Sequence, residues 1–441
     1  MSDVVVIGAG LAGLTTATRL MQQGKSVALV SKGIGGLQLG QGTIDFVGYD
    51  PDLVDDPIKE IDRTVDETHP YSHFSAKDAA FAAEWIRDLM GEELLVGDGQ
   101  RNYRLPTALG ALRPTALPQP SMVFGEPEGR NIVLVGFDRL KDFYPDLVAE
   151  NLRRQTNPDG TAIEARAIHV DLEVREGEVD SSGLQFARAL DSPEVQEELC
   201  ELVRPHLLDG EVVGFPAVLG LADTSAWKQI SKRLGHDVFE VVIQPPSVPG
   251  MRLNERFTRL VKSGMTDPGA VPSIPAQTGV LASRSRFILG GHVVGFDAEG
   301  DRLVSVTVAS AGHPTTLRAD EFVLATGGFE AGSLAMDSYG NVTETLFDLP
   351  LHGVTEELIN GDYWGEQPLF KVGLKVDEQM RPLDAAGQVV YSNLRAAGGL
   401  IGGANRWREK SGDGIALLTG LRAADSIAST GATETKEGSK K

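Results

Sequence analysis

Cysteine is almost absent from the sequence, because Cys200 is the only one among 441 residues. A single cysteine excludes a disulfide framework, a CxxC redox pair and an iron–sulfur cluster held by this chain alone. Cys200 lies in an apolar pattern at helical spacing, which favours a core position. We expect no metal site in this chain. If the chain transfers electrons, it therefore needs a carrier other than a metal centre.

Long hydrophobic runs and positive charge are also scarce. No apolar stretch approaches the ~20 residues that cross a bilayer, and Met1-Ser2-Asp3 leads into a strand pattern instead of a basic signal segment. The 41 Lys and Arg residues are outnumbered by 62 Asp and Glu, which gives a formal net charge of −21 at pH 7. This balance disfavours nucleic acid and anionic membrane as direct partners. We expect a cytoplasmic protein that reaches a membrane face only through partners.

Glycine, in contrast, is abundant and patterned at the start of the chain. Residues 4–13 read VVVIGAGLAG, a β-branched strand that runs into a GxGxxG motif and then into a helix. The first glycine allows the tight turn, the second lets the backbone approach a pyrophosphate, and the third permits close helix packing. A second strand at residues 27–30 completes the βαβ unit, which disfavours a strand-turn-helix without a ligand. The motif predicts a cofactor cradle formed by Gly8, Gly10, Leu11, Ala12 and Gly13.

The second strand lacks the acidic residue that usually holds the ribose in NAD-binding folds. Ser31 and Lys32 stand at its end instead, which weakens the NAD interpretation. Residues 32–43, KGIGGLQLGQGT, contain five glycines and suit a backbone lying against a flat ligand, although a flexible surface loop has a similar composition. The cofactor contacts expected here are Ser31, Lys32, Gly42 and Thr43.

Two later segments predict further close approaches of the backbone. Residues 322–328, FVLATGG, read as a buried strand that ends in a glycine pair. A helix expected at 415–424 follows Gly-Asp-Gly, so its free N–H groups face whatever lies before it. In a flavin site such a helix dipole would stabilise the negative charge of the reduced ring. The expected contacts are Thr326, Gly327, Gly328, Asp413 and Gly414.

The length and patterns predict an α/β fold of more than one domain. We expect a Rossmann-like flavin-binding domain with a central parallel sheet, interrupted by an inserted α+β domain. The flavin-binding domain would comprise residues 1–120, 256–335 and 386–430. The insertion, a substrate or cap domain, would comprise 121–255, with a cap or connecting segment at 336–385 and a flexible tail at 431–441.

Three segments together resemble the flavin-binding scaffold of the succinate dehydrogenase and fumarate reductase group. They are GAGLAG at 8–13, ADEFVLATGG at 319–328 and SGDGIALLTGLRAA at 411–424. More closely, the chain is similar to the B-subunit family of anaerobic glycerol-3-phosphate dehydrogenases. The residues that carry this similarity are ATRLMQQGKSVALVSKGIGGLQLGQGTIDFVGYDP at 17–51, His69-Pro70-Tyr71, LGALRPTALP at 109–118, IVLVGF at 132–137 and DFYPDLVAENL at 142–152.

The resemblance implies a cytoplasmic subunit paired with a larger flavoprotein subunit and with an iron–sulfur membrane-anchor subunit. The complex would oxidise sn-glycerol 3-phosphate to dihydroxyacetone phosphate and pass electrons to quinone, with fumarate or nitrate as terminal acceptor. The resemblance implies FMN, whereas the glycine motif favours FAD, and both stay open. Residues 31–68 contain no histidine, so the histidyl-flavin link of some relatives is not expected and binding should be noncovalent.

Oxidation of a secondary alcohol by flavin requires a base for the hydroxyl proton and cations for the substrate phosphate. His352 is a candidate base, although a lone histidine is more often a packing or surface residue. Guanidinium groups bind phosphate in a bidentate manner, but each candidate arginine could equally form an ordinary salt bridge. The candidates are Arg113, Arg252, Arg395 and Arg406.

Two other functions fit the same sequence. A standalone flavin oxidoreductase could act on an enoate, a steroid or an amino acid, but no second nucleotide fingerprint is present to serve NAD(P)H. Alternatively, the chain could be an electron-transfer or structural subunit whose partner performs the substrate chemistry.

Overall fold

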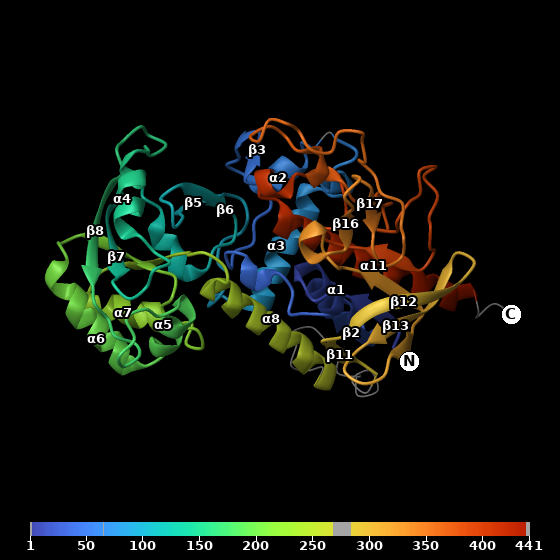
Figure 1. Cartoon of the computed structure of the whole chain (residues 1–441), viewed down its shortest axis with the longest axis horizontal. Helices are drawn as coiled ribbons and strands as arrows, with labels where there is room; N and C mark the ends of the chain where they lie inside the picture. The colour runs from blue at the N-terminus through green and yellow to red at the C-terminus, as the bar shows by residue number, and fades with distance from the viewer. Residues whose placement is uncertain (1, 65, 268–283, 438–441) are drawn as a thin grey trace.

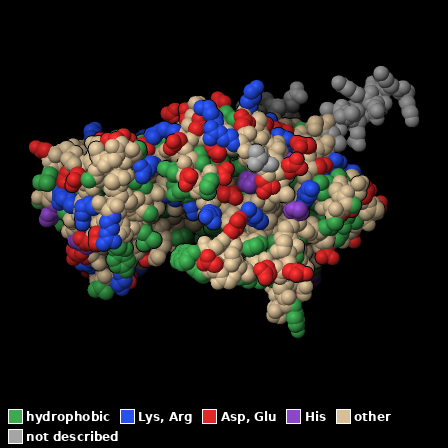
Figure 2. Space-filling view, turned by 90° about the horizontal axis from the view of Figure 1, so that it is seen from above, with side chains coloured by type: hydrophobic (Ala, Val, Ile, Leu, Met, Phe, Trp, Pro, Cys, Tyr) green, Lys and Arg blue, Asp and Glu red, His purple; other side chains and the backbone are tan. Residues whose placement is uncertain are grey.

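The computed structural model describes residues 2–64, 66–267 and 284–437, with the side chains of the last helix described as far as Ser429. Figure 1 shows two lobes of unequal size, the larger of which carries both ends of the chain. Each lobe has its own hydrophobic core. From above, a notch separates the lobes, and charged side chains of both signs are scattered over them (Figure 2).

The larger lobe is built on a five-stranded sheet in the order β11-β2-β1-β15-β18. All four strand pairs are parallel, with Val4 aligned to Val27 on one side and to Glu321 on the other. The central strands are largely apolar runs buried on both faces, as a parallel sheet requires. The predicted α/β class with a central parallel sheet is confirmed. The strands are β1 (Val4–Ile7), β2 (Val27–Ser31), β11 (Arg286–Leu289), β15 (Glu321–Leu324) and β18 (Leu394–Ala396).

Four longer helices pack in this lobe. Helix α1 lies against α11 so closely that the Thr16 hydroxyl donates to the Gly420 carbonyl oxygen over 3.1 Å. Helix α3 begins with a capping box, in which Ser75 and Asp78 bond reciprocally to backbone N–H groups. Helix α8 contacts both α1 and β11. The bounds are α1 (Leu11–Gln22), α3 (Ala76–Met90), α8 (Val248–Thr266) and α11 (Gly412–Glu437).

Shorter elements complete the larger lobe. An antiparallel three-stranded sheet follows β11, as the meander pattern predicted, and two hairpins lie at the periphery. A third hairpin, formed by residues 103–115, lies between the lobes, and its Leu112 packs against the core of the smaller lobe (Figure 1). These strands are β12 (His292–Glu299), β13 (Arg302–Ala309), β14 (Thr315–Arg318), β3 (Tyr49–Asp50), β4 (Asp52–Leu53), β5 (Tyr103–Pro106), β6 (Leu112–Thr115), β16 (Leu334–Met336) and β17 (Val342–Glu344), with helices α2 (Pro57–Ile61) and α10 (Arg406–Glu409).

The smaller lobe is a second parallel sheet, in the order β10-β9-β7-β8. We expected an α+β arrangement here, and that detail is wrong: every strand pair is parallel, and helices connect or follow the strands. The reason is local, because strands such as IVLVGF are apolar on both faces and need helices on both sides. The elements are β7 (Asn131–Phe137), α4 (Pro145–Arg153), β8 (Glu164–Val170), α5 (Gly183–Ala189), α6 (Pro193–Val203), β9 (Glu211–Pro216), α7 (Ala226–Leu234) and β10 (Val238–Val241).

The end of the chain differs from the expected tail. Helix α11 continues past Gly431 to Glu437, through residues that include the helix formers Ala and Glu; residues 438–441 lie outside the described residues. Within the described ranges, no helix is both long and apolar enough to cross a bilayer. The same residues contain no cluster of three or more His, Cys, Asp or Glu side chains suited to a metal ion.

Candidate functional site

The glycine motif lies at the junction of β1 and α1, and its three glycines have different surroundings. Gly8 has a φ of +111°, and a Cβ atom there would collide with the Ala325 carbonyl. A Cβ on Gly13 would collide with the Gly8 carbonyl. A Cβ on Gly10, in contrast, would meet no atom within 4 Å. The outer glycines are therefore needed for packing, whereas the middle one borders open space.

The first turn of α1 faces this open space without a cap. Its N-cap residue is Gly10, the first turn contains no acidic residue, and within the described ranges no side chain caps its first N–H groups. Uncapped N–H groups and the positive end of the helix dipole attract an anion. Leu11, Ala12 and Gly13 are buried in this turn, so the residues predicted to form the cradle lie together at the start of α1. The arrangement fits a phosphate or pyrophosphate group.

The glycine-rich loop after β2 crosses directly over the cradle. Gly35 lies so close to the carbonyl of Ala9 that a Cβ there would collide with it. At the start of the loop, the Ser31 hydroxyl donates to the Gly33 carbonyl oxygen, while Lys32 is exposed. At the far end of the loop, Thr43 is buried and Gly42 packs against Pro249 at the start of α8.

A second glycine wall comes from the end of β15 and from residues 398–399. Ala325 donates to the Ile7 carbonyl over 2.8 Å, which places the Thr326-Gly327-Gly328 turn beside the cradle. The Thr326 Oγ1 atom is buried and has no hydrogen-bond partner in the part of the chain that the structure describes. A buried hydroxyl without a protein partner suits a position that contacts a ligand.

Arg406 is the candidate arginine that lies at this wall. Its guanidinium group packs against Gly399, and it is also the nearest neighbour of a Cβ placed on Gly328, at 2.9 Å. Gly398 in turn faces Ala12 of the cradle. The Arg406 side chain is only 18% exposed and pairs with Glu330 at 3.3 Å. A cation is thus held beside the phosphate cradle.

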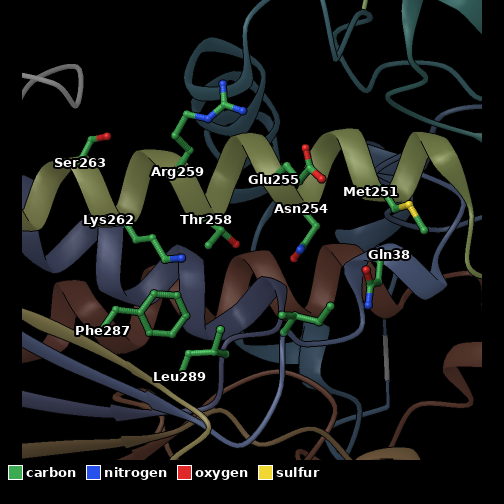
Figure 3. A pocket seen from close by; sticks show the side chains of 11 residues that line it. Gln38, Met251, Asn254, Glu255, Thr258, Arg259, Lys262, Ser263, Phe287 and Leu289 are labelled. Atoms are coloured by element: carbon green, nitrogen blue, oxygen red, sulfur yellow. The ribbon is translucent and has the colours of Figure 1, made fainter. Parts of the chain in front are cut away.

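A cavity of about 490 Å³ opens between α8 and β11 (Figure 3). Leu289 aligns with Ser31, which puts the cavity at the ends of β2 and β11, next to the loop that covers the cradle. The Lys262 ammonium group lies 5.5 Å from the centre of the Phe287 ring. Asn254 is 6% exposed, and its Oδ1 atom has no partner among the described residues. The other lining residues are Ile34, Gln38, Met251, Glu255, Thr258, Arg259 and Ser263.

A charged cluster lies where the glycine-rich loop meets the start of α11. The Arg113 guanidinium donates to Asp45, to Gln41 Oε1 over 2.6 Å and to Thr115 Oγ1 over 3.2 Å. The structure brings Arg113 and Asp413, both predicted, to this cluster.

The electrostatics of the cluster are dominated by burial. The pKa of Asp413 is raised to about 7, because burial and the charge of the neighbouring Asp45 raise it more than the attraction of Arg113 lowers it. Burial also raises the pKa of Asp45 against the attraction of Arg113. The pKa of Lys410 is lowered by burial and by repulsion from Arg113. Two cations and two carboxyls therefore share one poorly solvated site, and one carboxyl titrates near neutral pH.

The start of α11 is fixed by a buried tyrosine. The Tyr71 hydroxyl donates to the Phe46 carbonyl over 2.6 Å and lies 3.1 Å from the Ser411 carbonyl. A Cβ on Gly414 would collide with this hydroxyl, so glycine is needed there for packing. The amide of Gly414 donates to the Asp45 carbonyl over 2.8 Å, which ties the helix start to the cluster.

Sequence reasoning missed Asp45 and Lys410, and it noted His69 only within the family resemblance. His69 Nε2 lies 3.2 Å from Glu409 Oε2, and its Nδ1 accepts from the Tyr71 amide over 3.0 Å. The sequence offered one clue to Asp45. This residue lies two positions after Thr43, which ends the loop already assigned to the cofactor.

Three candidate catalytic residues lie away from this cluster or are fully engaged. Arg252 is buried in an ion pair with Glu240 of β10. Arg395 is buried against Glu321, and its side chain is 1% exposed. His352 is exposed, and its backbone pairs with Gly373. The two arginines therefore hold the fold together in this structure.

Comparison with known proteins identifies the family. The sequence matches the FAD binding domain family over residues 3–415. It is 30% identical to the probable anaerobic glycerol-3-phosphate dehydrogenase B-subunit of Halobacterium salinarum, over 97% of this chain and 98% of that protein. It is also 30% identical to the corresponding B-subunit of Pectobacterium atrosepticum, over 97% and 99% of the two chains.

The chain belongs to the B-subunit family of anaerobic glycerol-3-phosphate dehydrogenases, within the FAD binding domain group. The resemblance found in the sequence is confirmed, and so is the flavin cofactor. Members of this family are subunits of a multi-subunit dehydrogenase. Among solved structures, an open flavocytochrome c3 fumarate reductase is similar with a TM-score of 0.43 and 12% identity, over 97% of this chain and 78% of that one.

Proposed function

We propose that this chain is the flavin-carrying subunit of a respiratory dehydrogenase that oxidises sn-glycerol 3-phosphate to dihydroxyacetone phosphate. Family membership supports the substrate. The observation that carries the flavin role is the open space at Gly10 in front of the first turn of α1. Beside it lie Arg406 and the buried Thr326 hydroxyl, which has no hydrogen-bond partner among the described residues. Electrons would pass to quinone, with fumarate or nitrate as terminal acceptor.

We propose FAD as the bound form, held noncovalently. The family match favours it, and the cavity between α8 and β11 offers room beyond the cradle, at the strand ends where a second nucleoside would lie. FMN would need the cradle alone. Residues 31–68 contain no histidine for a covalent link.

For the substrate, we propose that Arg113 and Lys410 bind the phosphate group. They lie in the same buried cluster beside the glycine-rich loop, and their mutual repulsion would be relieved by a dianion. The flavin, when bound, accepts the hydride of the alcohol carbon. Asp413, with a pKa of about 7, is suited to take the hydroxyl proton, and we prefer it to the exposed His352.

The partners we propose are a larger flavoprotein subunit and an iron–sulfur membrane-anchor subunit of the same complex. They would hold this chain at the inner face of the cell membrane. Because Cys200 is the only cysteine, the ligands of any cluster would have to come from a partner.

The test is to purify the chain alone, release its flavin with acid, identify the flavin by chromatography, and add glycerol 3-phosphate anaerobically. FAD and bleaching of the flavin absorbance are expected. FMN would overturn the cofactor assignment. Flavin without bleaching would move the substrate site to a partner and favour an electron-transfer role, whereas bleaching by another substrate class alone would indicate a different oxidoreductase.

A further inference from the structure

Lys410 has a backbone conformation that lysine rarely adopts. Its φ is +56° and its ψ is +44°, in the left-handed region, where the Cβ atom of an L-residue is crowded. Among the described residues, only two other non-glycine residues, Asp348 and Met380, have a positive φ. Such a conformation persists where the surrounding contacts hold it, and it is frequent at functional sites. The contacts on both sides of Lys410 therefore bear on what this residue does.

The Glu409 carboxylate holds the backbone on both sides of Lys410. Glu409 Oε1 accepts from the Asn405 amide over 2.7 Å, at the start of α10. Glu409 Oε2 accepts from the Ser411 hydroxyl over 2.7 Å, just beyond the left-handed residue. The carbonyl of Glu409 accepts from the Gly48 amide over 2.7 Å. One side chain thus spans the reversal of the chain at Lys410, and its backbone ties that reversal to the first part of the chain.

His69 orients this carboxylate from a separate segment. Its Nδ1 atom accepts from the Tyr71 amide, so Nδ1 carries no proton, and Nε2 is the nitrogen that donates to Glu409 over 3.2 Å. The side chains of His69 and Glu409 are only 14% and 22% exposed. Burial alone would raise the pKa of Glu409, but the hydrogen bond from His69 and those from its other donors lower it below the ordinary value. The carboxylate is therefore ionised at neutral pH and fixed in one orientation.

The reversal directs the Lys410 side chain into the charged cluster. A Cβ placed on Gly48 would lie 2.9 Å from both Lys410 Cβ and Pro114 Cγ, so the lysine stem passes over Gly48, beside the strand that carries Arg113. The charges of Arg113 and Asp45 both act on the ammonium group. Because φ sets the direction in which the Cβ atom leaves the chain, a relaxed φ at this position would aim the ammonium group elsewhere.

We propose that Glu409, oriented by His69, is a positioning residue that holds the Lys410 ammonium group in the cluster beside Arg113. The inference rests on the proposed function for the role of that ammonium group, which is to bind the phosphate of the substrate. Glu409 acts on the phosphate only through the backbone of Lys410.

The first measurement needs no substrate. Trace acetylation with acetic anhydride over a range of pH, read by mass spectrometry, gives the pKa of the Lys410 amine. In the wild type this pKa is expected below the ordinary lysine value, because of burial and the charge of Arg113. Glu409→Ala should return it toward that value, since the released side chain would reach solvent. Glu409→Gln, in which an NH₂ group replaces one accepting oxygen, should do the same. Labelling of the exposed Lys375 should be equal in all variants.

Steady-state kinetics with glycerol 3-phosphate then tests what the position achieves. Glu409→Ala should raise the KM about tenfold and leave kcat within about twofold, as a loss of ground-state binding does. The double variant Glu409→Ala, Lys410→Met should have no higher KM than Lys410→Met alone, because the two residues act together. His69→Phe, which removes only the orienting bond, should give a smaller rise. The control is Glu378→Ala, which removes the exposed partner of His73 and should change neither parameter.

The outcomes separate this inference from the proposed function. An unchanged Lys410 pKa in the Glu409 variants would overturn the positioning role, and so would additive effects of the two substitutions on KM. A shifted pKa with an unchanged KM would support the positioning role and refute the phosphate assignment instead. Flavin content is measured for each variant, and loss of flavin from Glu409→Gln with the Lys410 pKa unchanged would show a purely structural role. If Glu409→Ala does not fold, Glu409→Gln serves for both measurements.

Discussion

Arg252 of α8 and Glu240 of β10 form a bidentate ion pair between the two lobes, with N–O distances of 2.7 and 3.0 Å. Both side chains are buried, at 2% and 0% exposure. The guanidinium also donates to the Gly220 carbonyl, and Glu240 accepts from the Leu219 amide over 2.8 Å. An arginine that sequence patterns placed among phosphate ligands therefore anchors the inserted lobe to the flavin-binding lobe.

Replacing Arg252 by Ala should destabilise the protein by roughly 3–5 kcal/mol, because Glu240 would be left charged and buried without its ion-pair partner. Thermal unfolding monitored by circular dichroism measures the loss. The exposed pair Lys141–Asp180 provides the control, and Lys141→Ala should leave the unfolding temperature unchanged. A wild-type unfolding temperature for the Arg252 variant would contradict this account of the lobe junction.

Gly10→Val should remove flavin while leaving the fold intact. The φ of Gly10 is −76°, which any residue adopts, and its Cβ would enter only open space where the cofactor phosphate is expected. Gly8→Val should instead lower stability or prevent folding, since it adds a collision at a φ of +111°. Flavin absorbance per chain and unfolding temperature separate the two effects. Normal flavin content in the Gly10 variant would refute the cradle.

Asp413→Asn should alter how stability depends on pH. The folded-state pKa of Asp413 is about 7, above its ordinary value of 3.8, so the folded state holds the proton more tightly. Its ionisation therefore costs stability progressively as pH rises from about 4 to about 7, and the cost stays constant above that. The unfolding temperature of the variant relative to wild type should rise across that window.

Asp209, which is exposed, supplies the control for this experiment, and Asp209→Asn should show no such trend. The same substitution at Asp413 should also remove the ionisation near pH 7 from the pH profile of glycerol 3-phosphate oxidation, if that residue takes the proton. A pH-independent difference in unfolding temperature would contradict the raised pKa.

Lys410→Met should raise the KM for glycerol 3-phosphate about 10- to 100-fold, the range expected for loss of a charged hydrogen bond. Arg113 is a less clean target because its removal would leave Asp45 without its ion-pair partner. Lys375→Met, at an exposed position, is the matched control. Steady-state kinetics with an artificial acceptor gives both parameters, and an unchanged KM would place the phosphate elsewhere.

The cradle could be predicted from sequence because it is local. Strand, glycine turn and helix follow one another within residues 4–22, and each glycine has a role set by its immediate neighbours. The meander at 292–318 was predictable for the same reason, since alternation and turns carry its signal.

The charged cluster could not be predicted, because its members are distant in sequence. Asp45 and Arg113 are 68 residues apart, and Asp413 joins them only when α11 packs against Tyr71. The periodicity of apolar residues predicts helices and strands, but it does not predict which distant side chains come into contact. The wrong expectation for the inserted lobe has a related cause, since apolar runs reveal a strand but not whether its neighbour is parallel.

Cys200 lies fully buried in the inserted lobe, where burial raises the pKa of its thiol to about 11. A thiol in that state is nearly all protonated at neutral pH and inaccessible to reagents. The native chain should consequently not react with maleimide dyes. One surface cysteine introduced at any chosen position would then be labelled alone, which makes this protein suitable for distance measurements between its two lobes without first removing a natural thiol.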